Sequence, residues 1–287
     1  MRKRWIAITV AVAIVVVAIA IGAGAHFFQP SSQNVAVPVK VSGPDGYIAS
    51  TVKPATGSME TTNDTGEPGW VQVRSTGDAP AYTDLSRGGM DAIRMHNPRV
   101  LKTYSSLHSP ILSMDSQVAK YSDAVVMNAS GYDMGGTNVA YGIQINNGQL
   151  IRDWPSTGLH YTFVINKDGS TKIYSSATSA KQIIDAGAEQ SYTFGTAIIW
   201  NGKAQNDGTV NWEGHSWIGT DADNNLYFLH TPTNEGYQRI LDFFESLHLT
   251  NAVEMDSGGS CRLAYLGKVL NPGDGRLVPD YIIAKAG

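Results

Sequence analysis

Short runs of β-branched and aromatic residues recur along the chain from residue 93 onward, and turn-forming residues separate many of them. The dipeptides Asn147-Gly148, Asp168-Gly169 and Asn201-Gly202 stand between such runs. Asn-Gly and Asp-Gly adopt the positive φ values that tight hairpin turns require, and a hairpin joins antiparallel neighbours. The pattern therefore predicts largely antiparallel or mixed sheets. The expected strands include residues 100–104, 124–127, 141–145, 161–165, 171–174, 196–200, 216–219, 226–229, 251–255 and 281–284.

Three segments have the spacing of helices, residues 115–121, 180–186 and 235–248. In the last of these, the apolar residues Tyr237, Ile240, Leu241, Phe244 and Leu247 recur every three or four positions, which is typical of an amphipathic helix. Asn234 is expected to cap it. Strands with few helices predict an α+β domain, and the length favours a single domain behind the N-terminal segments.

The first 28 residues resemble a membrane anchor. Arg2, Lys3 and Arg4 precede an uncharged apolar run from Trp5 to Ala25, and about 20 such residues cross a bilayer as a helix. Basic residues before the run predict a cytoplasmic N-terminus and an extracellular remainder. We therefore expect a single-pass protein of the cell membrane with a signal anchor at 1–28; the alternative is a signal peptide cleaved near Ala25 and a secreted product.

Residues 29–69 are rich in Pro, Ser, Thr and Gly, and we expect a disordered extracellular linker, followed by one folded domain over 70–287. The net charge of the chain is −4 and no basic stripe is visible, which argues against a nucleic-acid partner. Cys261 is the single cysteine. An intrachain disulfide is thereby excluded, so burial of a core has to stabilise the domain.

The most informative local feature is a glycine turn directly after the expected strand at 251–255. Glycines adopt positive φ and leave room for a ligand, hydroxyls donate hydrogen bonds, and the acid at the strand end is placed to act as a nucleophile or base. The alternative is an aspartate that only caps its own turn. The residues of the turn are Asp256, Ser257, Gly258, Gly259 and Ser260.

A second carboxylate and a second turn accompany the first. Glu254 lies two positions before Asp256, so a regular strand directs both to one face, and a pair of carboxylates is what glycoside hydrolysis requires. The second turn contains Asn128, Ser130, Gly131 and Asp133. An Asn amide at a strand end suits a phosphate oxygen or an N-acetyl group; the alternative is a local Asx turn.

These motifs stand in the order of a known family. The helix, the glycine turn and the pattern N-P-x-x-x-R at 271–276 resemble the C-terminal signature of the phosphodiester glycosidase domain. Segments 91–102, 124–133, 163–169 and 215–219 resemble its earlier landmarks, so the resemblance runs from about residue 91 to the C-terminus. The chain departs from the family at Ala129-Ser130 and at Ser257, each in place of glycine, and at His215 in place of arginine.

Together with the N-terminal segment, the resemblance implies an exported, membrane-anchored hydrolase that cleaves a sugar-1-phosphodiester in an envelope or extracellular glycopolymer. Asp256, Glu254 and His215 then have catalytic roles. Substrate contacts are expected from Arg276, which would hold the phosphate, and from Asn128, Ser130, Gly131, Asp133 and residues 257–260. No cofactor or metal is implied. The alternative from another class is a non-catalytic protein that binds an envelope glycan through the same fold.

Overall fold

The computed structural model describes residues 69–154, 161–206 and 213–287. The chain divides into two units, Met1–Val39 and Lys40–Gly287, and every described residue belongs to the second. The expected signal anchor, residues 1–28, and the expected linker, apart from Gly69, lie outside the described residues. Within the described ranges, no helix is both long enough and apolar enough to span a membrane.

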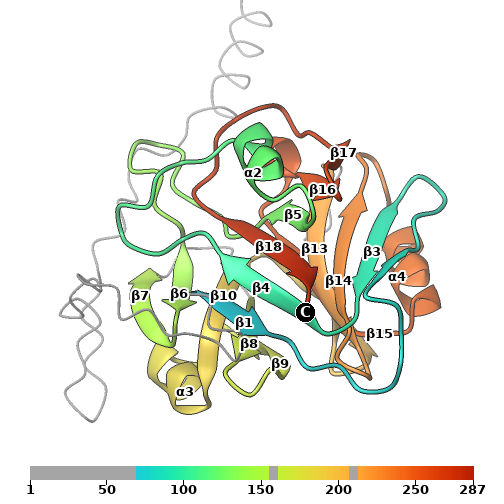
Figure 1. Ribbon diagram of the computed structural model, residues 1–287, viewed down its shortest axis with the longest axis horizontal. Coiled ribbons are helices and arrows are strands. Elements are labelled where there is room, and N and C mark those ends of the chain that lie inside the picture. Colours follow the sequence, from blue (N-terminus) through green and yellow to red (C-terminus); the bar gives the residue numbers. More distant parts are fainter. Residues whose placement is uncertain (1–68, 155–160, 207–212) are drawn as a thin grey trace, which may run out of the picture. The chain divides into compact units, whose positions relative to one another are not determined.

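The strands form four sheets, and all of the pairings described are antiparallel (Figure 1). The six-stranded sheet has the order β1 (Trp70–Gln72), β4 (Pro98–Lys102), β18 (Tyr281–Ala286), β5 (Val125–Asn128), β16 (Leu263–Tyr265) and β17 (Lys268–Asn271). The seven-stranded sheet has the order β12 (Lys203–Ala204), β11 (Ala197–Trp200), β15 (Leu249–Met255), β13 (His215–Asp221), β14 (Leu226–Thr231), β3 (Asp91–Met95) and β2 (Tyr82–Asp84). The smaller sheets are β10 (Ala188–Phe194), β8 (Tyr161–Asn166) and β9 (Thr171–Ser175), and the pair β6 (Gly142–Asn146) and β7 (Gln149–Trp154).

Three α-helices are described, at the positions the sequence predicts: α2 (Met114–Lys120), α3 (Ala180–Asp185) and α4 (Tyr237–Ser246). Ser113 caps α2, and Ser179 forms a capping box with Gln182 in α3. The predicted cap of the third helix is wrong, because Gly236 occupies that position and Asn234 lies before it with a φ of 64°. The α+β class with antiparallel sheets is confirmed.

The predicted hairpins are also confirmed. Asn147 and Gly148 connect β6 to β7, and Asn201 and Gly202 connect β11 to β12, all four with φ between 51° and 73°. Asp168-Gly169 lies in the turn between β8 and β9, where Gly169 has a φ of 84°. Each strand expected from the sequence overlaps an observed strand.

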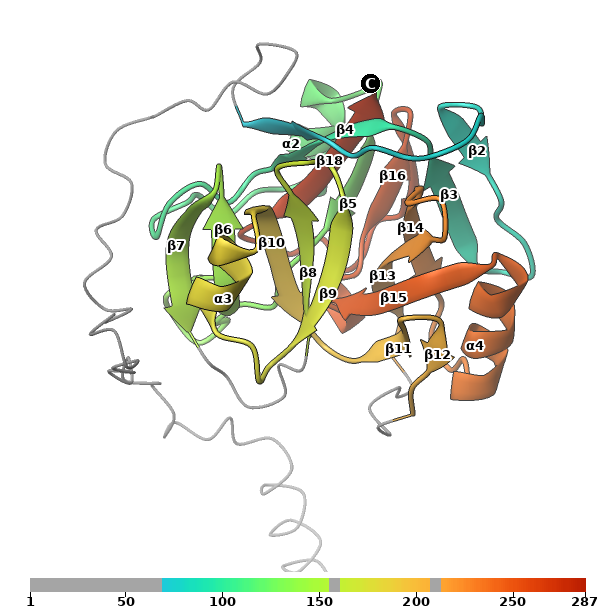
Figure 2. The ribbon, with the colours of Figure 1, turned by 90° about the horizontal axis from the view of Figure 1, so that it is seen from below.

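One hydrophobic core joins the three larger sheets. It contains side chains from β4, β5 and β18 of the six-stranded sheet, from β13, β14 and β15 of the seven-stranded sheet, and from β8 and β10. A second cluster packs α4 onto the seven-stranded sheet through Trp217, Ile240 and Phe244, and Figure 2 shows α4 beside β15. A third cluster includes Met114 of α2 with Val126 and Ile283 of the six-stranded sheet. Helices thus cover sheet faces that do not contribute to the shared core.

The register of the strands brings residues far apart in sequence to one place. Ser216 near the start of β13 pairs with Met255 at the end of β15, while Tyr281 at the start of β18 pairs with Asn128 at the end of β5. The ends of β5 and β15 therefore meet the starts of β13 and β18. The catalytic candidates lie at this junction.

Candidate active site

The turn that carries Asp256 is fixed to the end of β5. The Asp256 N–H donates to the Ala129 carbonyl at 2.7 Å, and the Asn128 amide donates to the Asp256 carbonyl at 2.5 Å. Because Asp256 directly follows β15, these two bonds join the seven-stranded sheet to the six-stranded sheet. The backbone that presents the carboxyl group is consequently held from both sides.

The Asp256 carboxyl group is desolvated and incompletely hydrogen-bonded. Its Oδ2 atom is shielded from solvent and has no hydrogen-bond partner among the described residues. Burial raises the pKa of Asp256 to about 7; the hydrogen bond with Ser260 opposes the shift, the charge of Asp280 adds to it, and the charge of Arg276 opposes it. A carboxyl group with a pKa near 7 is suited to exchange a proton at neutral pH.

Glu254 and His215 form a buried pair. His215 Nδ1 lies 2.7 Å from Glu254 Oε1, and the two side chains are 0% and 7% exposed. Since a carboxylate accepts, the proton lies on Nδ1, and the pair fixes the tautomer and orientation of the imidazole. The Glu254 carboxylate also accepts from the Thr196 N–H at 3.3 Å. Glu254 is thereby placed to orient His215.

Gly195, between β10 and β11, provides the space for this pair. A Cβ atom at Gly195 would lie 2.0 Å from Glu254 Oε2, so any larger residue would displace the carboxylate. His215 in turn packs against Trp217, with 5.4 Å between ring centroids, and Trp217 packs edge-on against Phe244 of α4. The His215 side chain is therefore supported by the helix as well as by its carboxylate.

Asn128 links four segments of the site. Its Oδ1 atom accepts hydrogen bonds from Ser216 Oγ at 2.7 Å and from the Arg262 N–H at 2.8 Å, in addition to the bond its amide donates to Asp256. The side chain is fully buried. The structure thus brings Asn128 next to Asp256 and assigns its amide a positioning task.

The other predicted residues of the second turn hold the loop itself. Ser130 is buried and its N–H donates to Asp280. A Cβ atom at Gly131 would lie 2.4 Å from the Phe194 ring. The Asp133 carboxylate accepts from the Gly135 and Thr137 N–H groups and from the Thr137 hydroxyl, and that hydroxyl is the main reason why its pKa is lowered. Asp133 therefore closes its own loop.

The glycine turn forms a short 3-10 helix over Gly258–Ser260. The N–H groups of Gly258, Ser260 and Cys261 donate to carbonyls of Gly214, Ser257 and Gly258. These three backbone donors are already in use within the protein. Gly258 has a φ of 62°, as a glycine turn requires, and a Cβ atom there would meet the Glu213 carboxylate at 3.2 Å.

Arg276 lies beside this turn, and its guanidinium holds a neighbouring carboxylate. Arg276 Nε lies 3.0 and 2.9 Å from the two oxygens of Asp274, and Nη2 also contacts Asp274. The effect of Arg276 on the pKa of Asp256 shows that its charge acts on the catalytic candidate.

Sequence reasoning missed Arg262, which is 1% exposed and two residues beyond the turn. Its Nε donates to the Pro272 carbonyl at 3.1 Å, and Nη2 lies 3.7 Å from Asp274 Oδ1. The residue type and spacing gave no signal, because an arginine at the start of a strand usually extends into solvent.

Tyr132 and Tyr141 were also missed. Burial raises the pKa of each tyrosine, and the charge of Asp256 adds to the shift in both. Tyr132 is 8% exposed and donates to the Leu277 carbonyl, whereas Tyr141 is partly exposed and stacks edge-on with Trp154 at 5.4 Å. An aromatic side chain beside the candidate carboxylate could have been anticipated from Gly131-Tyr132-Asp133.

Cys261 is inert in this setting. The thiol is 1% exposed and lies 3.1 Å from Ser216 Oγ and 3.3 Å from Asn271 Nδ2. Burial raises its pKa to about 12, and Asp256 and Glu254 both add to the shift. The thiolate needed for nucleophilic catalysis is therefore not populated. No group of three or more His, Cys, Asp or Glu side chains in the described ranges is arranged to hold a metal ion.

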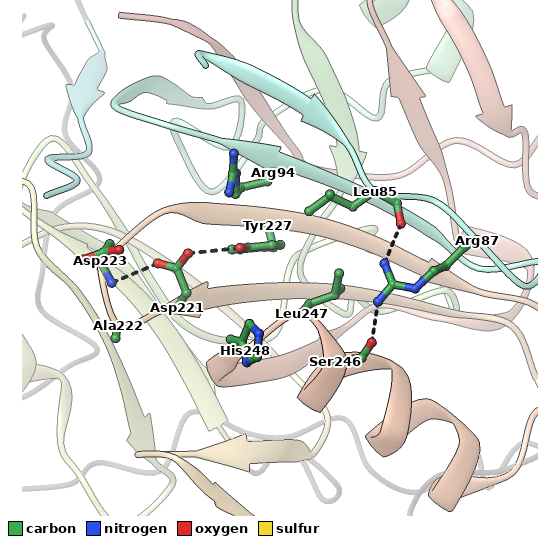
Figure 3. A pocket seen from close by; sticks show the side chains of 10 residues that line it. All are labelled: Leu85, Arg87, Arg94, Asp221, Ala222, Asp223, Tyr227, Ser246, Leu247 and His248. Atoms are coloured by element: carbon green, nitrogen blue, oxygen red, sulfur yellow. Dashed lines mark hydrogen bonds between the residues drawn. The ribbon is translucent and has the colours of Figure 1, made fainter. Parts of the chain in front are cut away.

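A cavity of about 360 Å³ lies elsewhere, at the other end of β13 and β15 (Figure 3). Arg94, Tyr227 and His248 line it together with the turn at Asp221. The Asp221 carboxylate already accepts from the N–H groups of Asp223 and Asn225, from the Asn225 amide and from the Tyr227 hydroxyl. Because this acid is fully hydrogen-bonded, the cavity lacks the desolvated carboxyl group found at Asp256, and we place the active site at Asp256.

The fold and the site define a class of protein, an antiparallel α+β domain with a desolvated carboxyl group on which the charge of Arg276 acts. The family model for phosphodiester glycosidases matches residues 121–285, which is more than half of the chain. The chain belongs to the phosphodiester glycosidase family. Hydrolysis of a phosphodiester-linked sugar is the activity of this family. A comparison with curated proteins finds no match.

Solved structures also match the chain at low sequence identity. The catalytic domain of zebrafish N-acetylglucosamine-1-phosphodiester alpha-N-acetylglucosaminidase, auto-inhibited by its pro-peptide, superimposes with a TM-score of 0.59 and 15% identity, over 82% of this chain and 95% of that chain. A hypothetical protein from Synechocystis has a TM-score of 0.49 and 11% identity, over 76% of this chain and 69% of that chain. At such identities the first likeness shows the shared fold.

Proposed function

We propose that this protein is an exported, membrane-anchored phosphodiester glycosidase that cleaves the bond between an anomeric sugar carbon and phosphate in an envelope or extracellular glycopolymer. The observation that carries the proposal is the Asp256 carboxyl group at the end of a strand: its Oδ2 atom is shielded from solvent, its pKa is about 7, and the charge of Arg276 acts on it. Membership of the family supports the reaction class.

In this reaction water supplies an oxygen to the anomeric carbon, and the bond from that carbon to the phosphate oxygen breaks. Ionised Asp256 either attacks the anomeric carbon first or removes the proton of the attacking water. The leaving phosphate monoester keeps the electron pair of the broken bond, and the Arg276 guanidinium stabilises its charge. A phosphate leaving group lessens the need for a strong general acid.

His215 and Glu254 assist this step as a hydrogen-bonded pair. The Glu254 carboxylate accepts a hydrogen bond from His215 Nδ1, which fixes the orientation of the imidazole. Glu254 acts through His215 in this scheme and is a positioning residue. Contact of His215 with the substrate anion is part of the proposal.

Export and anchoring rest on the N-terminal sequence. Three basic residues precede an apolar run long enough to cross a bilayer, and the residues after it are typical of an extended linker. A polymer at the cell surface is then the substrate class within reach. The alternative of a cleaved signal peptide gives the same compartment without the anchor.

The second candidate function is binding of an envelope glycan without hydrolysis, because the chain has Ser257 in place of a glycine and His215 in place of an arginine of the family pattern. Asn128, Ser130 and Asp133, which were expected to contact substrate, all use their polar groups within the protein. One experiment separates the two functions. Full-length protein is incubated with a sugar-1-phosphodiester, and free reducing sugar is measured. Release that Asp256→Asn abolishes establishes the hydrolase, whereas saturable binding without release establishes the glycan-binding protein.

A further inference from the structure

The loop between β17 and β18 places a carboxylate between two arginines. Asp274 Oδ1 and Oδ2 lie 3.0 and 2.9 Å from Arg276 Nε, and Oδ1 lies 3.7 Å from Arg262 Nη2. Arg276 belongs to this loop, two residues after Asp274, whereas Arg262 precedes β16. An anion between them is therefore within reach of both positive charges.

One hydrogen-bond donor of Arg262 remains without a partner among the described residues. Its side chain is 1% exposed, and Nη2 has no hydrogen-bond partner in the part of the chain that the structure describes, because 3.7 Å is too long for a hydrogen bond. A buried donor of a charged group without a partner is costly. An anion with more than two oxygens, seated where Asp274 lies, would reach Nη2 without releasing Arg276.

The Asp274 carboxylate also lies directly on the glycine turn. A Cβ atom at Gly259 would come within 2.2 Å of Asp274 Oδ2, and the Asp274 N–H donates to the Gly259 carbonyl at 3.0 Å. Asp256 is three residues before Gly259, and the charge of Arg276 opposes the rise in the pKa of Asp256. The position of the carboxylate is thus adjacent to the proposed reaction centre.

We propose that Arg262 and Arg276 form the binding site for the phosphate group of the substrate, and that the Asp274 carboxylate occupies this site until the phosphate displaces it. The proposal rests on the proposed function for the identity of the anion. A tetrahedral phosphate offers oxygens to both guanidinium groups, whereas a planar carboxylate satisfies one.

Displacement of the Asp274 carboxylate from Arg276 costs little free energy. The Asp274 and Arg276 side chains are 45% and 37% exposed, and ion pairs this exposed contribute little to stability. The loop residues on either side of Asp274 are the glycines Gly273 and Gly275. The carboxylate can rotate into solvent while Arg276 stays in place.

The test is the affinity of the full-length protein, in detergent, for inorganic phosphate, measured by calorimetry. Asp274→Asn removes the competing charge and is expected to tighten phosphate binding by about three- to tenfold. Asp185→Asn is the matched control, because Asp185 is an exposed aspartate in an ion pair with Lys181 on α3, and the change of charge is the same. Unchanged or weaker binding in Asp274→Asn, relative to this control, would overturn the proposal.

A second variant tests Arg262. Arg262→Lys keeps the charge but loses the planar fork, and we expect phosphate affinity to fall about tenfold while thermal unfolding confirms a folded protein. Unaltered affinity in a folded Arg262→Lys protein would remove Arg262 from the site. For a variant that does not fold, a crystal structure of the wild-type protein with phosphate decides: phosphate on both arginines supports the site, and phosphate elsewhere refutes it.

These outcomes are independent of turnover. Phosphate binding with the expected response to Asp274→Asn, but no release of sugar from a sugar-1-phosphodiester, would retain the anion site and refute the hydrolase. Release of sugar with no response to Asp274→Asn would retain the hydrolase and refute the displaced carboxylate.

Discussion

The behaviour of Asp256 depends on its surroundings more than on its residue type. The same strand-end aspartate in solvent would be fully ionised at neutral pH, whereas burial in this site raises its pKa to about 7. An asparagine has nearly the same shape but cannot ionise. We expect Asp256→Asn to lower kcat by about 10²-fold or more, measured as sugar released from a sugar-1-phosphodiester, with an unchanged circular dichroism spectrum. Wild-type rates in this variant would assign the reaction to another group.

The pH dependence of the reaction follows from the same pKa. As a nucleophile or base, Asp256 has to be ionised, so kcat/KM is expected to rise about tenfold per pH unit below pH 7 and to level off above it. A phosphodiester keeps its single charge over this range, so the enzyme determines the profile. Rates that instead fall as the pH rises through 7 would identify Asp256 as a general acid.

Asp256 also makes folding stability depend on pH. Between pH 4 and pH 7 the unfolded aspartate is ionised while the folded one still binds a proton, so stability declines over this window and stays lower above it. Asp256→Asn removes the decline, and we expect its free energy of unfolding at pH 8 to exceed that of the wild type by about 2–4 kcal/mol. Urea denaturation at pH 4 and pH 8 measures the difference, which should vanish at the lower pH.

At the scale of elements, the junction between β10, β11 and β15 holds the carboxylate that orients His215. Gly195→Ala is tolerated by the backbone, because Gly195 does not have a positive φ, but its Cβ atom would collide with Glu254. We expect kcat to fall at least tenfold with a loss of about 1–3 kcal/mol in stability. Gly236→Ala is the control for kcat: no atom lies within 4 Å of a Cβ there, and because Gly236 is the N-cap of α4 the change lowers stability without touching the site. An equal loss of kcat in both variants would argue against a role for the Glu254 and His215 pair.

Strand positions could be predicted where local chemistry decides them. The Asn-Gly and Asp-Gly turns fix three hairpins, and the apolar spacing fixes α4. The strand β10 was missed because its buried residues Gln190, Ser191 and Thr193 are polar. Their side chains are buried only because they bond to the carbonyls of Val100 and Ile143, which lie far away in sequence. A pattern of alternating hydrophobicity does not detect such a strand.

Only the part of the site that is contiguous in sequence could be predicted. The glycine turn and its aspartate are contiguous in sequence, so their residue types identify them. The pairing of Glu254 with His215, the bonds of Asn128 and the burial of Arg262 depend on how β5, β13, β15 and β16 come together. Spacing along one chain carries no information about those distances.

At the scale of the whole molecule, the N-terminal sequence predicts which side of the membrane the domain occupies. We expect a protease added to intact cells to release a fragment that begins within residues 29–69, while an epitope at Met1 stays protected. The measurement is immunoblotting with a tag at each end, and a cytoplasmic protein of the same cells is the control. Protection of the C-terminal tag in intact cells would contradict export.

The rate at which the buried thiol of Cys261 is alkylated can report how often the active-site turn opens. Alkylating reagents react with the thiolate, and a thiol that is 1% exposed with a pKa of about 12 offers almost none at neutral pH. Labelling by iodoacetamide therefore reports the rare moments when the turn opens. As the chain has a single cysteine, each label marks this place alone. A ligand that contacts both the glycine turn and the loop between β17 and β18, which contains Arg276, will slow labelling in proportion to its occupancy. The labelling rate therefore measures binding without turnover of a substrate.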